Sequence, residues 1–287
     1  MPQRILLKTT IPTTEDDWHI GRFSQLAGHL ENCTDDRGDR HDVAARDRIE
    51  ADGDDVDLTA AARGEFDQVW LFGVDVTNAL SAGDIENLRA FRAGGGGLFL
   101  TRDHQDLGAC LSRIAEVGPT QYFQTSNPEP DAARHCCDDL DTPEITWPNY
   151  HSGANGDLQA VTIAGPLHPL MQRASGEAIE RLPCHPHEGT VGVPAGMETV
   201  ARVVATGVSQ TSGAAFNLCV AVDEPGQGRA VSDSSFHHLC DFNWNPQLGC
   251  PTFVTETPGS TVIDDAHALD DVHAYVANVA RWIARTH

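Results

Sequence analysis

The sequence predicts an α/β fold, with a mostly parallel sheet, helices on both faces and a loop-rich insertion. The main observation is a strand, a helix and a second strand in succession between residues 68 and 101. An amphipathic helix closes the chain, and 287 residues with 40% hydrophobic content can bury a substantial core. We therefore expect residues 1–287 to form a single α/β domain.

The first predicted elements are a strand and a helix. The run RILLKTTI (4–11) is almost continuously apolar and predicts a buried strand. A helix is expected over 15–30, with an apolar side made of Trp18, Phe23, Leu26 and Leu30. The segment 35–57 is mostly charge and glycine, so it predicts a solvated loop or an exposed helix without chemistry.

The next unit carries the clearest local signals. QVWLFGV (68–74) reads as a strand, Ser81 with Asp84 resembles a capping box, and GGGG (94–97) ends the helix before the strand LFLT (98–101). Ligands of parallel sheets bind beyond the carboxyl ends of the strands. The residues after Thr101 are therefore candidates for a site.

The rest of the chain adds an insertion, more strands and a last helix. Residues 118–165 are rich in loop-forming residues and predict an insertion or lid over one end of the sheet. Strands are expected at 197–206, 214–224 and 228–236. The final helix spans 265–285, with a shared apolar face of Leu269, Val272, Val276, Val279 and Ile283.

Charge and composition exclude several classes of partner. The formal charge is −23, from 42 acidic and 19 basic residues, and Lys8 is the only lysine. Such a chain repels phosphate backbones and anionic lipid, so we expect neither a nucleic acid nor a membrane as partner. No stretch approaches the roughly 20 apolar residues of a membrane span, and no export signal is visible, so we expect a cytoplasmic location. The eight cysteines form no CxxC pair and suit reduced intracellular thiols.

The first candidate site cluster follows the strand that ends at Thr101. The segment RDHQDLG contains Arg102, Asp103, His104 and Asp106. Ionisable groups at the edge of a buried strand are costly unless they are paired, solvated or used. We expect Asp103 and His104 to be catalytic, and Arg102 and Asp106 to contact the substrate.

The second cluster lies in PCHPHEGTVG. In an extended backbone His185 and His187 face the same way, and Glu188 faces the other side or orients a histidine. Three interpretations remain open. His185, His187 and Glu188 could bind one divalent metal, either zinc, iron or manganese; His187 and Glu188 could perform acid–base catalysis without metal; or the segment could be a structural turn.

The third cluster is the segment SSFHH, with Asp241 following it. Strand alternation places His237 and His238 on opposite sides, so we expect His237 to be catalytic and His238 at most to contact substrate. The loop NYHSGANGD adds His151 and Asn155 as candidate substrate contacts. No nucleotide cofactor is expected, because the glycines 94–97 precede a strand, whereas a phosphate-binding loop follows one.

Two segments resemble a known superfamily. FDQVWLFGVDVTNALSAGDIENLRAFRAGGGGLFLTRDHQDLG (66–108) is similar to the class I glutamine amidotransferase-like proteins, especially the ThuA-like branch associated with trehalose utilisation. GRAVSDSSFHH (228–238) resembles the late strand of that superfamily, which ends in histidine. The resemblance implies a flavodoxin-like sheet and, by analogy with the branch, a sugar or another small polyhydroxy substrate.

The chain departs from the amidotransferase pattern at the reacting groups. Those enzymes carry a cysteine at the elbow after the first of these strands, and a glutamate two places after the late histidine. Here the elbow region holds Asp103 and His104, and His237 is followed by His238 and Leu239. The resemblance therefore implies the location of a site without implying glutamine hydrolysis.

Together these features predict an enzyme that acts on a small polar molecule by histidine and carboxylate acid–base chemistry, either hydrolysis or isomerisation. The prediction requires the three clusters to meet at one edge of the sheet. The alternative is a non-catalytic module that binds a ligand or a protein. The C-terminal helix could pack on the sheet or pair with a second copy, so a homo-oligomer remains open.

Overall fold

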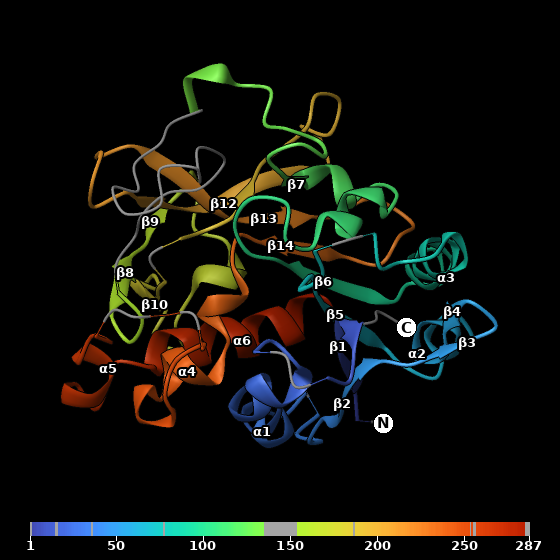
Figure 1. Ribbon diagram of the computed structural model, residues 1–287, viewed down its shortest axis with the longest axis horizontal. Helices are drawn as coiled ribbons and strands as arrows, with labels where there is room; N and C mark the ends of the chain where they lie inside the picture. The colour runs from blue at the N-terminus through green and yellow to red at the C-terminus, as the bar shows by residue number, and fades with distance from the viewer. Residues whose placement is uncertain are drawn as a thin grey trace.

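The computed structural model describes residues 2–284, apart from 15–16, 36, 77, 135–153, 186, 253 and 255–256. Its centre is an eight-stranded sheet of order β2-β1-β5-β6-β14-β13-β12-β9 (Figure 1). The first five strands in this order, β2, β1, β5, β6 and β14, are parallel to one another. The remaining three, β13, β12 and β9, are antiparallel to their neighbours. The predicted mostly parallel α/β sheet is confirmed, with an antiparallel extension at one side.

The parallel strands are β1 (Arg4–Pro12), β2 (Asp42–Arg48), β5 (Gln68–Phe72), β6 (Gly97–Thr101) and β14 (Ala230–Asp233). The antiparallel strands are β9 (Thr162–Ile163), β12 (Ala201–Val208) and β13 (Ala215–Val222). Three short pairs lie outside the main sheet: β3 (Glu50–Ala51) with β4 (Asp54–Asp55), β7 (Gln121–Tyr122) with β11 (Thr190–Val191), and β8 (Leu158–Ala160) with β10 (Arg181–Pro183).

Helices cover both faces of the sheet. They are α1 (Ser24–Asn32), α2 (Val56–Ala62), α3 (Ala82–Ala93), α4 (Asp241–Trp244), α5 (Thr261–Asp264) and α6 (Asp270–Trp282). Short 3-10 turns are η1 (Ile20–Phe23), η2 (Ala109–Arg113), η3 (Gly118–Thr120), η4 (Ala132–Arg134), η5 (Pro169–Met171), η6 (Phe236–His238) and η7 (Pro246–Leu248). Within the described residues, none of the helices has the length and apolarity needed to cross a membrane.

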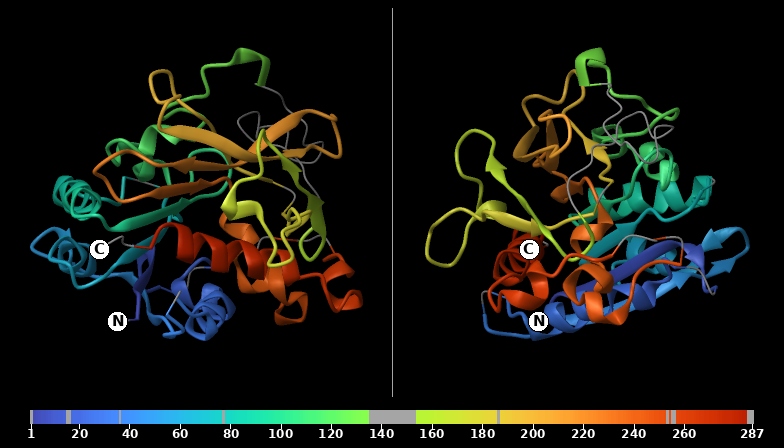
Figure 2. Two further views of the ribbon diagram at one scale, coloured as in Figure 1. Left: turned by 180° about the vertical axis from the view of Figure 1, so that it is seen from behind. Right: turned by 60° about the vertical axis from the view of Figure 1, so that its left-hand side comes forward.

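The alternation of side chains along β1 explains why two helix layers form. Ile5 and Leu7 face the layer of α1 and α6, whereas Leu6 faces the layer of α2 and α3 (Figure 2). All three side chains are fully buried, and each contributes about 2 kcal/mol relative to exposure. The predicted capping box is present at α3, where Ser81 and Asp84 exchange hydrogen bonds.

The first helix begins later than the sequence indicated, and a distant residue explains the difference. Helix α1 starts at Ser24, so Trp18 lies before it. The carboxylate of Asp241 accepts hydrogen bonds from the backbone nitrogens of Ser24 (3.2 Å) and Gln25 (2.9 Å). A tertiary cap of this kind cannot be read from local spacing. The last helix also begins later, at Asp270.

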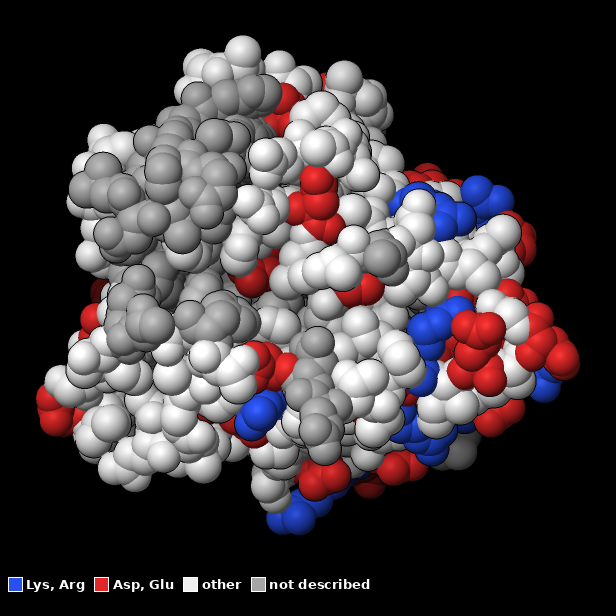
Figure 3. Space-filling model, in the orientation of Figure 1, with Lys and Arg blue, Asp and Glu red and all other residues white. Residues whose placement is uncertain are grey.

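The prediction of a solvated loop or exposed helix over residues 35–57 is wrong about the secondary structure, although residues 37–40 and 49–53 are exposed as expected. This segment forms the edge strand β2 and the β3–β4 pair, and runs into α2. The buried amine of Lys8 lies 2.9 Å from Asp55 and 2.7 Å from Asp57, so charges that suggested exposure are paired inside the protein. Acidic and basic side chains also intermingle on the surface over α3, β3 and β4 (Figure 3).

The predicted insertion, residues 118–165, is described only at its two ends. Strand β7 pairs with β11, β8 pairs with β10, and β9 joins the main sheet as an edge strand. Residues 135–153, which include the predicted contact His151, lie outside the described residues.

Three segments meet at the carboxyl end of the parallel sheet. Strands β6 and β14 pair in register, with Thr101 opposite Asp233, so the segments after them start side by side. The backbone nitrogen of Gly189 donates to the Ser234 carbonyl oxygen at 3.0 Å. A side chain at Gly189 would collide with that oxygen and with the side chain of Arg102. Glycine at this position therefore lets the 184–189 loop approach the sheet.

Gly189→Ala should lower the free energy of unfolding by about 2–3 kcal/mol, because the added methyl group has backbone on one side and a buried guanidinium on the other. Urea unfolding followed by circular dichroism measures the change. Gly28→Ala in α1 is the matched control, since nothing lies within 4 Å of a side chain there, and it should raise stability by up to about 1 kcal/mol. Equal stability of the Gly189→Ala and wild-type proteins would show that the close approach is unimportant.

Candidate active site

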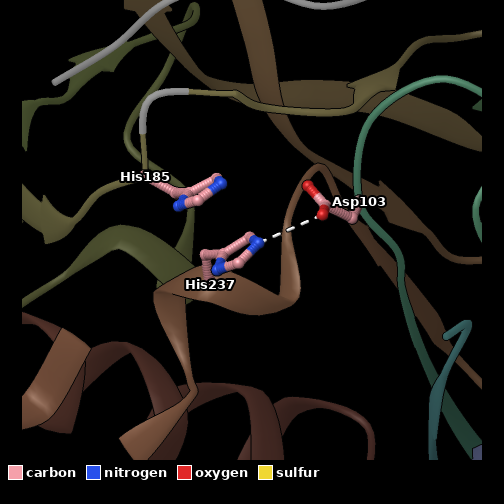
Figure 4. Close-up of side chains that lie close together, drawn as sticks. All are labelled: Asp103, His185 and His237. Atoms are coloured by element: carbon pink, nitrogen blue, oxygen red, sulfur yellow. Dashed lines mark ion pairs between the residues drawn. The ribbon is translucent and has the colours of Figure 1, made fainter. Parts of the chain in front are cut away.

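The three convergent segments place one carboxylate and two imidazoles together. Asp103 follows β6, His185 follows β10, and His237 lies in η6 after β14. One ligand atom from each lies within 4.8 Å of the other two, and all three residues are buried. Figure 4 shows the two rings one above the other, with the Asp103 carboxylate beyond the same edge of both. The segment with His185 reaches this point through the short β8–β10 pair instead of through a strand of the main sheet.

Asp103 is the carboxylate at the centre of the cluster. Its Oδ2 lies 3.2 Å from Nδ1 of His104 and 3.1 Å from Nε2 of His237. Burial alone would raise the pKa of Asp103, but His104 and His237 lower it well below its usual range. The carboxylate is therefore ionised, and it lies within ion-pair distance of two imidazoles.

His185 and His237 form a stacked pair. Their ring centroids are 3.6 Å apart and their planes differ by 8°. Nδ1 of His185 lies 2.7 Å from Oδ1 of Asn155; because an amide oxygen only accepts, Nδ1 carries the proton. Burial lowers the pKa of both histidines; the positive charge of His237 lowers the pKa of His185 further, whereas Asp103 partly offsets the effect of burial at His237. Both rings are therefore neutral near pH 7, and Nε2 is the unprotonated nitrogen of the His185 ring.

Two further histidines lie towards the outside of the cluster. The ring centroid of His187 is 5.6 Å from that of His185 and 5.3 Å from that of His104. His104 and His187 are partly exposed, in contrast to His185 and His237. The outer pair is thus positioned to meet a molecule that enters from solvent.

A hollow of about 620 Å³ opens beside Asp103 and His104. Its lining comes from the segments after β1, β5 and β6, together with residues of the loop after β7: Asp17, Trp18, Val74, Val76, Asp103, His104, Gln105, Asp106, Leu107, Gln124 and Thr125. This is the end of the parallel sheet where ligands of such folds bind. Its volume suits a small molecule.

Glu188 and His238 belong to a fully buried network that adjoins the cluster, since Oε1 of Glu188 accepts from the backbone nitrogen of His185 at 3.3 Å. His238 lies between two carboxylates, with Nδ1 at 2.9 Å from Asp233 and Nε2 at 3.5 Å from Glu188. The hydroxyl of Tyr275 donates to the other Asp233 oxygen at 2.7 Å. The set that the structure draws together is therefore Asp103, His185 and His237, which differs from the expected metal ligands His185, His187 and Glu188.

The other expected contact residues have structural partners. The guanidinium of Arg102 is fully buried and donates to the carbonyl oxygens of Gln105 (2.6 Å) and Tyr122 (2.8 Å), so it lies inside the protein. Asp106 lines the hollow while its Oδ1 accepts from the backbone nitrogen of Thr125 at 2.9 Å. Asn155 contacts His185 instead of solvent, because it is buried.

Sequence reasoning missed Trp18 and Asp233. Trp18 packs edge-on against His237, with 4.9 Å between the ring centroids, and it lines the hollow. Both residues are signalled by strand ends, since Trp18 follows β1 and Asp233 is the last residue of β14. Trp18 was expected in the helix 15–30 and Asp233 inside the strand 228–236. Neither residue was therefore recognised as lying at or beyond the end of a strand.

Cys240 is a cysteine that contacts the cluster. Its Sγ lies 4.0 Å from Nδ1 of His237, but the thiol is fully buried. Burial raises the pKa of Cys240 to about 12, which leaves the thiol protonated and inert at neutral pH. Cys240 therefore does not replace the elbow cysteine of the amidotransferases.

Comparison with known proteins supports the fold. No family model and no curated protein sequence matches the chain. Cytoplasmic Protein STM3548 from Salmonella typhimurium is similar at 11% identity and a TM-score of 0.52, over 98% of this chain and 99% of that one. The Trypanosoma brucei CTPS glutaminase domain with bound acivicin matches at 15% identity and a TM-score of 0.51, over 97% and 92%.

A thua-like protein from Bacteroides uniformis is also similar, at 11% identity and a TM-score of 0.46, over 98% of this chain and 91% of that one. At these identities the likenesses concern the fold alone. The match to the glutaminase domain supports the expected amidotransferase-like α/β fold.

The buried Glu188–His238 pair makes stability depend on pH. Burial raises the pKa of Glu188 from 4.5 to about 7. Burial would lower the pKa of His238, but Asp233 and Glu188 raise it from 6.5 to about 9. Stability from a raised pKa is complete below the unfolded value and is lost as pH rises through the folded value. The free energy of unfolding should therefore fall by about 3 kcal/mol between pH 6.5 and 9.

Urea unfolding at half-unit intervals of pH measures this slope. His238→Gln should reduce the slope between pH 6.5 and 9 by removing the His238 titration, whatever its effect on absolute stability, and the remaining slope should come from Glu188. The same substitution at the exposed His267 should leave the slope unchanged. A wild-type free energy of unfolding that is constant or rises over this window would contradict the prediction.

Proposed function

We propose that this protein is a hydrolase or isomerase that acts on a small polar, sugar-like molecule by histidine and carboxylate acid–base chemistry. The observation that carries the proposal is the buried carboxylate of Asp103, whose Oδ2 lies 3.2 Å from Nδ1 of His104 beside the hollow. A carboxylate that fixes the orientation and tautomer of an imidazole is the arrangement general acid–base catalysis requires.

In this proposal His104 exchanges the proton. Its Nδ1 faces Asp103, so Nε2, on the other side of the ring, acts on the substrate. His104 is partly exposed and lines the hollow, whereas His237 shares the same carboxylate from a buried position. His237 thus positions Asp103. His187 is the second candidate for proton transfer, because its ring lies 5.3 Å from that of His104.

The lining of the hollow supports a small, hydroxyl-rich and uncharged substrate. Carboxylate, amide and hydroxyl groups of Asp17, Gln124 and Thr125 can accept and donate hydrogen bonds to hydroxyl groups, and Trp18 and Val74 add apolar surface. Carboxylates at the opening disfavour phosphate and carboxylate groups. A sugar-like substrate also agrees with the ThuA-like resemblance, which is an argument by analogy of fold.

The test compares variants on one panel of substrates. The panel contains p-nitrophenyl glycosides for hydrolysis and aldose–ketose pairs for isomerisation. For the substrate that the wild type turns over, His104→Ala should lower kcat by about 100-fold to 10,000-fold with little change in KM, since the imidazole acts on the transition state.

His267→Ala, at an exposed histidine paired with Asp270, is the control and should keep full activity. His187→Ala tests whether His187 transfers the proton instead of His104: the residue whose loss lowers kcat is the one that transfers it. Full turnover by His104→Ala and His187→Ala together would refute the proposal. Sugar binding by the wild type with no turnover on the panel would favour a binding module instead.

A further inference from the structure

We propose that Asp103, His185 and His237 bind one divalent transition-metal ion at the inner side of the active site. Two imidazole nitrogens and one carboxylate oxygen suit zinc, iron or manganese. The inference deepens the proposed function, with which it shares Asp103, but its central measurement is metal content instead of turnover.

The first argument is the geometry of the three groups. Their ligand atoms lie within 4.8 Å of one another. Atoms bound to one ion at about 2.1 Å are at most about 4.2 Å apart, so the three ligand atoms are already close to the separation that one ion requires. The three residues come from three separate segments that the close approach of Gly189 brings together, so the backbone supports the arrangement.

The second argument is a pair of buried polar atoms that lack hydrogen bonds among the described residues. Oδ1 of Asp103 has no such partner, and Nε2 of His237 makes no well-aligned hydrogen bond although it lies 3.1 Å from Oδ2 of Asp103. Leaving a buried carboxylate oxygen unpaired is costly. An ion beside Oδ1 would satisfy it, while Oδ2 continues to hold His104.

The third argument is the support around His185. Metal-binding histidines usually donate their other ring nitrogen to an oxygen that fixes the tautomer. Nδ1 of His185 does so to Oδ1 of Asn155 at 2.7 Å, so Nε2 is the ring nitrogen that would bind the ion. Asn155 therefore positions the ring of His185, although Asn155 itself does not line the hollow.

The stacking of the rings decides which side chain must move. Two parallel rings 3.6 Å apart cannot both hold one ion in their planes. The ring of His185 is restrained by Asn155, whereas Nδ1 of His237 has only the weak contact with Cys240 at 4.0 Å. We therefore expect the ring of His237 to turn on binding. The bound ion would polarise a carbonyl group or activate water next to His104.

The first measurement is the metal content of protein purified without a histidine tag or chelator, determined by inductively coupled plasma mass spectrometry. One equivalent of zinc, iron or manganese is expected.

Stripped protein is then titrated with Zn²⁺ against a chromogenic chelator in 0.5 M NaCl, which screens the acidic surface. A single tight site is expected, and Co²⁺ at that site should give visible absorption bands.

Variants identify the ligands. Asp103→Asn and His185→Gln should each weaken Zn²⁺ binding by about 100-fold or more, and Asn155→Leu by about 10-fold to 100-fold. His273→Ala is the matched control, because His29 and His273 form another stacked pair, 4.3 Å apart. It should bind Zn²⁺ like the wild type. Circular dichroism establishes that each variant is folded, and Asn155→Leu provides the test if a ligand variant fails to fold.

The two proposals fail separately. Absence of bound metal in the purified protein together with no Zn²⁺ site tighter than that of the Asp103→Asn variant would overturn the metal site, and turnover that depends on His104 would still support acid–base catalysis. One equivalent of metal in both wild-type and His104→Ala proteins, with equal turnover, would support the metal site and refute the role of His104.

Discussion

The candidate site depends on the parallel pairing of β6 with β14. Because Thr101 lies opposite Asp233, the segments that follow both strands leave the sheet at the same level. Asp103 and His237 then meet across a short gap, although 134 positions separate them in the sequence. A shift of this register by one residue would turn the side chains of β14 to the opposite face and separate the pair.

The loop after β10, which carries His185, is positioned by loop contacts and not by strand pairing in the main sheet. No strand of the main sheet carries His185, so the sheet alone does not position it. Instead, Gly189 makes a backbone hydrogen bond to Ser234 and packs against Arg102. Arg102 uses its guanidinium for backbone carbonyl groups nearby. The same arginine therefore shapes the segment after β6 and the surface on which the histidine loop rests.

Hydrophobic periodicity and capping residues predicted those elements whose structure depends mainly on residues nearby in the sequence. The strand, helix and strand from 68 to 101 were found in this way, down to the capping box at Ser81. The edge strand β2 was missed because its charges suggested solvent, while in the folded chain Lys8 and other distant residues pair with this region. The start of α1 was missed because Asp241 supplies its cap from far along the chain.

The same distinction holds for the candidate site. Strand ends drew attention to the segments of Asp103 and His237, which meet in the structure because parallel strands end at the same edge of the sheet. The sequence did not predict that His185 and His237 would join Asp103 while His238 would lie in the adjoining buried network. This arrangement depends on the partners of Glu188 and His238, which spacing within PCHPHEG and SSFHH does not reveal.

The single lysine of the chain has a practical consequence for chemical labelling. The amine of Lys8 is enclosed between β1, β2 and the start of α2, where it contacts Asp55, Asp57 and the carbonyl oxygen of Asp47. An acylating reagent reaches this nitrogen only when that edge of the sheet opens. Since the sequence offers no other lysine side chain, the rate at which Lys8 is acylated reports how often the contacts of β1 with β2, β4 and the start of α2 open around it.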